Sequence, residues 1–250
     1  VGGAGLSGAT AKAVNKGAIK ESKTASDGFG CLDAETGEEV WKQDIPGKPQ
    51  HWGVSGTPVV ANGRVYICGS TGTAYCLNAR DGSVVWKQKL TAMTHASFLV
   101  ADGLAIVPGT TLTALNADTG DVVWTCKAVR TNSNSPVLWR SGGKAYALCN
   151  TQKKAFCVDL ANGKVLWSVP GGRESTPVIV GDTMVILADE DVGLMAYRIT
   201  PESATKLWQV TDVFDRGSSP VVHDGHVYVA AKGKAACVSL ADGKVKWEQK

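Results

Sequence analysis

Apolar and polar residues alternate along most of this chain in short runs that are separated by turn residues. Residues 64–68 (Arg-Val-Tyr-Ile-Cys) illustrate the pattern, with Asn62-Gly63 before them and a Gly-rich turn after them. Alternation with a period of two predicts a strand with one buried face, and Asn-Gly suits a type I′ turn because both residues tolerate positive φ. We therefore predict four strands joined by hairpins into one antiparallel sheet, at residues 55–60, 64–68, 73–77 and 83–86.

The same pattern recurs along the chain, and each of its six copies ends in a tryptophan. The closing residues are Trp41, Trp86, Trp124, Trp167, Trp208 and Trp247, spaced 45, 38, 43, 41 and 39 residues apart. A period of about forty residues made of four short strands is typical of a β-propeller blade. The predicted fold class is therefore all-β: a β-propeller of four-stranded antiparallel blades, with five complete blades and half of another.

Most of these tryptophans follow a glycine by four residues, and we interpret both residue types as structural. The Gly provides the positive φ of a tight turn, and the large Trp ring can cover the flank of the next blade. The residues assigned to this role are Gly37, Trp41, Gly82, Trp86, Gly120, Trp124, Gly163, Trp167, Trp208, Gly243 and Trp247. Ala204 replaces the glycine in the fifth copy, which makes that blade the candidate for a specialised role.

The first copy of the repeat is incomplete. Residues 29–33 and 39–41 supply only two predicted strands, and residues 1–28 are rich in Gly and Lys without a Pro-Val strand. We interpret residues 1–28 as an insertion or partial first blade, and residues 29–250 as the propeller domain. Because a propeller closes to protect its sheet edges, we expect this chain to be an excerpt of a propeller with about seven or eight blades.

Charge and hydropathy exclude two classes of partner. The formal charge is only +3, and Lys and Arg are scattered through every repeat, so nucleic acid is not an expected partner. The chain has no run of about 18 apolar residues, so no membrane span is expected either.

Cysteine is concentrated at one position of the repeat, occupied by Cys31, Cys76, Cys157 and Cys237. Equivalent positions in neighbouring blades lie about 10 Å apart, which is too far for a disulfide. We interpret Cys at this position as a small buried residue. The pairs Cys68/Cys76 and Cys149/Cys157 each flank a predicted hairpin, and a disulfide across either hairpin stays open as an alternative to free thiols.

The loops that join the last strand of one blade to the first strand of the next carry the candidate binding residues. These loops open onto one face of a propeller, where converging polar groups form binding sites. The candidates are His51, Trp52, His95, Asn132, Asn134, Arg173, Glu174, Asp215 and Arg216. Each has a structural alternative: surface charge for the ionic residues, turn capping for the asparagines, packing for Trp52 and an isolated side chain for each histidine. The acidic residues 189–191 are interpreted as a solvated turn, because a Ca²⁺ site needs about six oxygens.

The phrase Leu-Asp-Ala-x-Thr-Gly-x-x-x-Trp, complete at residues 32–41, follows Ser-Pro-Val or Thr-Pro-Val strands in several copies. Over residues 29–250 this pattern resembles the repeat of pyrroloquinoline-quinone-like (PQQ-like) propellers. One group of that family is non-enzymatic and includes BamB, a lipoprotein of the outer-membrane β-barrel assembly machinery. Resemblance to this group implies a bacterial, periplasmic or secreted scaffold that binds a protein or peptide and needs no cofactor.

The other group consists of quinoprotein alcohol and sugar dehydrogenases, which place further demands on the sequence. These enzymes hold the quinone between a Trp and a disulfide of two adjacent cysteines, and bind Ca²⁺ through a carboxylate and an amide. No two cysteines are adjacent in this chain. We therefore predict a non-catalytic, protein-binding propeller without metal ligands. A PQQ- and Ca²⁺-dependent dehydrogenase is the alternative, and binding of a small ligand or glycan at Trp52 is another.

Overall fold

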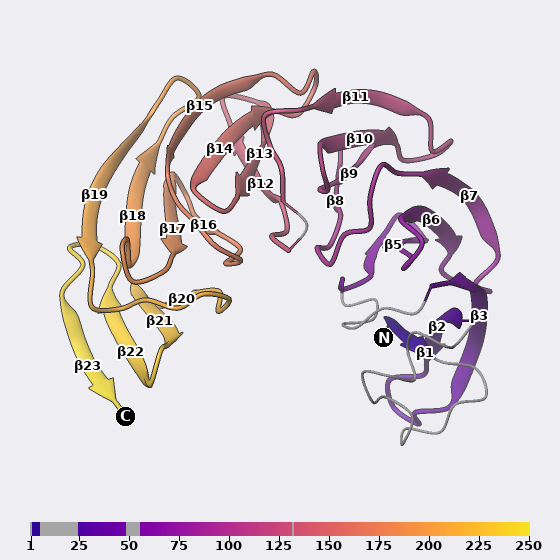
Figure 1. Cartoon of the computed structure of the whole chain (residues 1–250), viewed down its shortest axis with the longest axis horizontal. Coiled ribbons are helices and arrows are strands. Elements are labelled where there is room, and N and C mark those ends of the chain that lie inside the picture. Colours follow the sequence, from indigo (N-terminus) through magenta and orange to yellow (C-terminus); the bar gives the residue numbers. More distant parts are fainter. Residues whose placement is uncertain (1, 6–24, 49–55, 132) are drawn as a thin grey trace. The chain divides into compact units, whose positions relative to one another are not determined.

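Every regular element in the described part of the chain is a β-strand. The computed structural model describes residues 2–5, 25–48, 56–131 and 133–250. Their strands form one three-stranded sheet and five four-stranded sheets, each antiparallel and ordered along the chain (Figure 1). The predicted fold class is thereby confirmed, and we number the sheets as blades 1 to 6. The chain divides into two compact units, Val1–Val123 and Trp124–Lys250, which are described separately.

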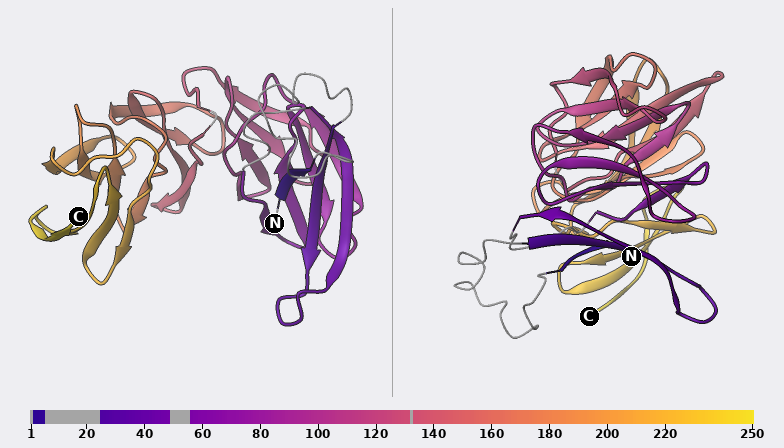
Figure 2. Two further views of the ribbon diagram at one scale, coloured as in Figure 1. Left: turned by 60° about the horizontal axis from the view of Figure 1, so that its bottom comes forward. Right: turned by 90° about the vertical axis from the view of Figure 1, so that its right-hand side faces the viewer.

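The first unit contains blades 1 and 2 and most of blade 3. The strands of blade 1, side by side in Figure 2, are β1 (Gly2–Gly5), β2 (Ala25–Leu32) and β3 (Glu39–Gly47). Blade 2 consists of β4 (Val59–Ala61), β5 (Arg64–Cys68), β6 (Thr73–Asn78) and β7 (Val84–Lys89). Blade 3 consists of β8 (Leu99–Ala101), β9 (Leu104–Val107), β10 (Leu112–Asn116) and β11 (Val122–Cys126), and the unit boundary falls within β11.

The second unit contains blades 4, 5 and 6. Blade 4 consists of β12 (Val137–Ser141), β13 (Lys144–Asn150), β14 (Lys154–Asp159) and β15 (Val165–Pro170). Blade 5 consists of β16 (Val178–Val180), β17 (Thr183–Leu187), β18 (Leu194–Ile199) and β19 (Ala204–Val210). Blade 6 consists of β20 (Val221–His223), β21 (His226–Ala231), β22 (Lys234–Ser239) and β23 (Val245–Gln249).

The innermost strand of blade 2 is shorter than the sequence predicts. We predicted a strand over residues 55–60, but the observed strand β4 begins only after Pro58. Proline has no N–H to donate to a sheet, so pairing begins beyond it. The following hairpin has positive φ at both Asn62 (50°) and Gly63 (70°), as a type I′ turn requires.

A small residue lies directly opposite the closing Trp in each of the five blades whose register is described. Cys31 pairs with Trp41, Cys76 with Trp86, Cys157 with Trp167 and Cys237 with Trp247, and a register shift follows each cysteine. In blade 5 the residue opposite Trp208 is Ala196. Facing residues share one side of a sheet, so a small side chain leaves room for the indole ring.

Five of the six closing indoles then contact the next blade within their unit. The Nε1–H groups of Trp41, Trp86, Trp124, Trp167 and Trp208 donate to backbone carbonyls of Ala79, Ala117, Leu160, Thr200 and Leu240, at 2.8–3.0 Å. The rings also lie on the turn glycines. A Cβ added to Gly82 would lie 2.5 Å from the Trp41 ring, and one added to Gly163 would lie 2.5 Å from the Trp124 ring. The glycine is therefore required for the close approach of the ring as well as for its positive φ.

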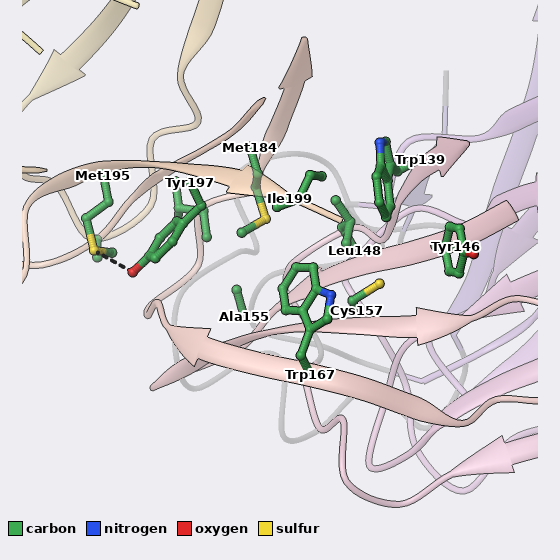
Figure 3. Close-up of a cluster of buried hydrophobic side chains, with 12 residues drawn as sticks. Trp139, Tyr146, Leu148, Ala155, Cys157, Trp167, Met184, Met195, Tyr197 and Ile199 are labelled. Carbon is green, nitrogen blue, oxygen red and sulfur yellow. Dashed lines mark hydrogen bonds between the residues drawn. The ribbon is translucent and has the colours of Figure 1, made fainter. Parts of the chain in front are cut away.

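The space between blades is filled by apolar side chains from both. Between blades 4 and 5, Trp139 and Trp167 pack in one buried cluster with Met184 and Tyr197 (Figure 3). Trp139 is only 3% exposed, and its Nε1–H donates to Asp182. Trp139 is not one of the six closing tryptophans, and its burial makes it part of the core.

All seven cysteines are free thiols, so neither hairpin disulfide forms. Cys149 faces Phe156 and Cys157 faces Leu148, which places the two thiols on opposite sides of their sheet. Cys68 faces Ala74 while Cys76 faces Tyr66, so these two thiols are diagonal rather than opposite. Six of the cysteines are buried, and Cys31 is partly exposed.

Candidate functional site

Five of the predicted loop residues that the structure describes belong to the second unit, where two kinds of loop meet at one end of the blades. One kind joins the outermost strand of a blade to the innermost strand of the next, as residues 171–177 join β15 to β16. The other kind joins the two middle strands of one blade, as residues 188–193 join β17 to β18. We call the polar groups gathered here the loop cluster; its members are Asn134, Asn150, Arg173, Glu174, Ser175, Asp189, Asp215 and Arg216.

Two buried asparagines hold the loop between β15 and β16 in place. The Asn134 Nδ2 donates to the carbonyls of Arg173 at 2.7 Å and Ser175 at 2.9 Å. The Asn150 Nδ2 donates to the carbonyls of Gly172 at 3.0 Å and Ser175 at 2.9 Å, and its Oδ1 accepts from the Gly172 N–H. Both side chains are at most 1% exposed, so these hydrogen bonds form without competing water. The loop backbone is thereby fixed from two sides.

Arg173 has an unusual backbone conformation that this support maintains. Its φ is 63°, in the left-handed region that residues with a Cβ rarely adopt. Such strain persists where surrounding contacts over-determine the backbone, and it concentrates at functional sites. The Arg173 guanidinium pairs through Nε with the Asp189 carboxylate, and both side chains keep partial exposure. The acidic turn at 189–191 therefore supplies a partner to Arg173.

A second charged pair joins this loop to the loop between β19 and β20. The Arg216 guanidinium lies 3.8 Å from the Glu174 carboxylate, and the Glu174 N–H donates to the Arg216 carbonyl at 3.0 Å. Arg216 is 73% exposed at its side chain, so the pair itself contributes little to stability and the guanidinium faces solvent.

Asp215 organises the same loop. Its N–H donates to the Ala188 carbonyl, and its Oδ1 accepts from the N–H groups of Gly217 and Ser218 at 2.8 Å. Partial burial by itself would raise the pKa of Asp215, but these backbone hydrogen bonds outweigh it and lower the pKa below its usual value. The carboxylate is held ionised, so it acts as a turn cap as well as a surface charge.

In three pairs of neighbouring blades, a Ser or Thr hydroxyl before the first strand of one blade accepts a hydrogen bond from a backbone N–H of the blade before it. The Thr57 N–H donates to Ser97 Oγ at 3.1 Å in the first unit, and the Thr176 N–H donates to Ser219 Oγ at 3.0 Å in the second. Ser135 makes the same bond to Thr176. The Ser or Thr of the Ser/Thr-Pro-Val phrase therefore has a structural role, which the repetition alone did not reveal.

Four predicted site residues lie outside the loop cluster as described. His51, Trp52 and Asn132 fall outside the described residues. His95 belongs to the first unit, in the loop between β7 and β8, and is partly exposed. Stacking on Trp52 therefore stays a prediction, and so does a role for His95.

Sequence reasoning missed three members of the loop cluster. Asn150 and Ser175 are buried at blade ends and carry no charge that would single them out. Asp189 was assigned to a solvated turn, and its pairing with Arg173 depends on the approach of two loops. The Gly171-Gly172 pair beside Asn150 was the available signal: a Cβ added to Gly171 would lie 2.6 Å from the Asn150 Oδ1.

No group of three or more His, Cys, Asp or Glu side chains in the described residues is arranged to hold a metal ion. Within the same residues there is no helix with the length and apolar character needed to span a membrane.

A known protein family matches this chain over the residues that contain the blade repeat. The sequence profile described as "Outer membrane protein assembly factor BamB" matches residues 28–249. The chain belongs to this family. BamB of Yersinia pestis is 25% identical over 228 residues, which cover 88% of this chain and 51% of that protein. The chain spans about half the length of the curated BamB proteins it matches first.

Solved structures support the same fold for this BamB family member. BamB from Moraxella catarrhalis superposes with a TM-score of 0.72 at 16% identity, covering 90% of this chain and 66% of that one. A quinohemoprotein alcohol dehydrogenase from Comamonas testosteroni gives a TM-score of 0.60 at 15% identity, covering 79% of this chain and 43% of that one. At these identities the likeness concerns the propeller fold alone.

The residues present do not fit the quinone site of the dehydrogenases. That site uses a disulfide between adjacent cysteines, and the seven cysteines of this BamB family chain are all separated in sequence. Burial raises the pKa of the Cys157 thiol to about 12 and raises that of Cys149 further, which makes these thiols unreactive. No catalytic step through a quinone is derived for this chain.

Proposed function

We propose that this chain acts as a non-catalytic, protein-binding propeller in the assembly of outer-membrane proteins, as the name of its relatives describes. The observation that supports this proposal most directly is the loop cluster of the second unit. Its backbone is fixed by Asn134 and Asn150, while Arg173 and Arg216 present guanidinium groups beside carboxylates. A rigid loop surface with exposed bidentate donors suits recognition of a folded protein, because little entropy is lost on binding.

The proposed location follows from the same relationship. A factor that assembles outer-membrane proteins works on the periplasmic side of that membrane, so we place this chain in the periplasm or outside the cell. The partner is then a protein or peptide, and no cofactor takes part.

Site-specific crosslinking in the bacterium that encodes this chain tests the proposal. A photo-crosslinking residue at Arg216 should yield a covalent adduct with one protein, which mass spectrometry identifies as a component or client of outer-membrane assembly. Asn162 is the control position, because it is exposed in the turn between β14 and β15 and lies outside the loop cluster. Adducts at both positions, or none at either, would contradict a specific protein-binding surface at the loop cluster.

An enzymatic assay tests the alternative function, that of a PQQ- and Ca²⁺-dependent dehydrogenase. The same protein, incubated with PQQ, Ca²⁺ and a redox dye, should reduce no dye when alcohols or sugars are added. Turnover with stoichiometric quinone binding would overturn the proposal of a non-catalytic scaffold.

A further inference from the structure

Blade 2 differs from the other blades in the residues that follow its closing tryptophan. Its sequence is Trp86-Lys-Gln-Lys89, with lysine at the first and third positions after the indole. In the other copies of the repeat these two positions are occupied by Lys42 and Asp44, Thr125 and Lys127, Ser168 and Pro170, Gln209 and Thr211, and Glu248 and Lys250. Blade 2 is therefore the one copy of the repeat with a cation at both positions.

The strand register places these two lysines beside two hydroxyl residues. Lys87 of β7 pairs with Tyr75 of β6, and Lys89 pairs with Thr73. Directly paired residues, and residues two apart on one strand, share one face of a sheet. Tyr75 is 7% exposed and belongs to the apolar cluster between blades 1 and 2, so all four side chains lie on the face of blade 2 that is turned toward blade 1.

This face of blade 2 borders a cavity of about 420 Å³. The four side chains line it together with Thr71 of the turn between β5 and β6, and with Pro46 of blade 1. Among the described residues no carboxylate lines the cavity. In blades 1 and 6, by contrast, a lysine pairs with the carboxylate that follows the closing tryptophan, Lys42 with Asp44 at 3.5 Å and Lys234 with Glu248 at 2.6 Å. The cavity thus presents two ammonium groups and three hydroxyl groups.

Hydrogen bonds hold one side of this cavity in place. The Lys89 ammonium donates to the Thr71 carbonyl, and the hydroxyl oxygens of Thr71 and Thr73 are hydrogen bonded at 3.1 Å. The turn that carries Thr71 is fixed to blade 1, because the N–H and the hydroxyl of Ser70 donate to the Asp27 carboxylate at 2.7 and 3.0 Å. These groups are therefore positioned before any ligand binds, which reduces the entropy lost on binding.

We propose that this cavity binds a phosphate monoester. The Lys87 ammonium makes no hydrogen bond or ion pair with any described residue, so its three N–H groups are available to a ligand. The charge of the two lysines matches the charge of about −1.5 to −2 that a phosphate monoester carries at pH 7, whereas a carboxylate would compensate only one lysine. The hydroxyl groups donate to the remaining phosphate oxygens, and Pro46 and the Tyr75 ring offer apolar surface to the organic part of the ester.

The cavity lies in the first unit and does not include the loop cluster. The proposal therefore does not depend on the proposed function, and either of them can fail without the other.

Titration of the whole chain with glycerol 3-phosphate tests the proposal. Backbone amide chemical shifts at residues 71–75 and 87–89 should change and saturate, with a Kd of about 1 mM or lower in low-salt buffer. Acetate is the probe for carboxylates, and it should bind at least about tenfold more weakly because it carries a single charge.

A second arm of the experiment identifies the source of the phosphate group. Phosphatidic acid carries the same monoester on a lipid, so the chain is sedimented with vesicles of phosphatidic acid and phosphatidylcholine, and with vesicles of phosphatidylcholine alone. Binding to the first vesicles that Lys87→Gln weakens would support the proposal with a lipid as the source. Binding of the soluble ester without binding to vesicles would support it with a free phosphate ester as the source.

Matched variants locate the binding. Lys87→Gln should weaken binding of glycerol 3-phosphate by at least about tenfold, because it removes one of the two charges that face the ligand. Lys87→Arg keeps the charge and should retain most of the affinity. Lys246→Gln removes the same charge from the outermost strand of blade 6, outside the cavity, and should leave binding unchanged. Both positions are exposed, so circular dichroism should show all three variants folded.

Three results would overturn the proposal. The first is absence of saturable binding up to about 10 mM glycerol 3-phosphate together with absence of binding to the phosphatidic acid vesicles. The second is equal binding by the wild-type chain and the Lys87→Gln variant. The third is binding of acetate as tight as that of glycerol 3-phosphate, which would assign the cavity to carboxylate groups.

Discussion

At the scale of single residues, the contact between a tryptophan and the turn of the next blade depends on two small side chains. Cys76 leaves room for the Trp86 ring within its own sheet, and Gly120 leaves room in the next blade, where an added Cβ would lie 2.7 Å from the ring. The repeat therefore keeps small residues on both sides of the Trp ring, in addition to the residues that form the turn. A cysteine in this position acts through its size, and its thiol takes no part in chemistry.

Gly82→Ala tests the role of space at these turns. Gly82 has φ of 73°, and its added Cβ would meet the Trp41 ring at 2.5 Å. We expect the variant to lose about 1–3 kcal/mol of unfolding free energy beyond the cost of backbone strain. Gly37→Ala is the control, because Gly37 has φ of 75° and nothing within 4 Å of an added Cβ. Urea unfolding that gave equal losses for both variants would show that only φ matters.

Thiol labelling tests the burial of the cysteines. Cys31 is partly exposed, whereas the other six cysteines are buried. In the native protein we expect one thiol to react quickly with Ellman's reagent and six to react only when urea is added. Cys31→Ser should remove the rapid phase. Rapid reaction of two or more thiols would contradict the described packing.

At the scale of elements, the loop between β15 and β16 obtains its shape from the ends of other elements. Asn150 is the last residue of β13, and Asn134 precedes β12, yet both donate to the Ser175 carbonyl. Residues so far apart in sequence meet only because neighbouring blades bring their loops to one end. The left-handed φ of Arg173 is a consequence of this support.

Asn150→Ala should release the loop. The change removes three hydrogen bonds and leaves the buried N–H of Gly172 without its acceptor. We expect a loss of about 1–3 kcal/mol in unfolding free energy and faster hydrogen exchange over residues 171–176.

The matched control is Asn162→Ala. Asn162 is exposed and accepts a single bond from the Lys164 N–H, so its replacement should cost no more than about 0.5 kcal/mol. Hydrogen exchange at 171–176 that stayed unchanged in Asn150→Ala would show that Asn134 alone holds the loop.

At the scale of the whole molecule, two carboxyl groups should give the stability of the fold opposite dependences on pH. Burial raises the pKa of Asp27 in the first unit, although the Ser70 hydroxyl and N–H both donate to its Oδ2. Its Oδ1 has no hydrogen-bond partner among the described residues. Backbone hydrogen bonds lower the pKa of Asp215 in the second unit.

The signs follow from the unfolded value of about 3.9 for Asp. The folded state binds a proton on Asp27 more tightly than the unfolded state, so this stabilisation is present below about pH 4 and is lost as pH rises through the folded pKa. The contribution of Asp215 is present above about pH 4 and is lost as pH falls through its folded pKa.

Urea unfolding across the range from about pH 3 to pH 7 checks both signs. Relative to Asp27→Asn, the wild-type protein should lose stability as pH rises from the lower end of this range. Relative to Asp215→Asn, it should gain stability over the same interval. Parallel curves for the wild type and either variant would contradict the assigned shift.

The sequence by itself determined the number and order of the complete blades, their antiparallel strands, their turn positions and the tryptophans that join them. These features depend on neighbouring residues and recur about every forty residues, so the six copies all support the same prediction of strands and turns. Only the tertiary structure decided that Arg173 pairs with Asp189 and that Asn134 and Asn150 hold one loop. These contacts join residues that do not recur from copy to copy, so the repeating pattern could not predict them; they depend on which loops meet at the blade ends.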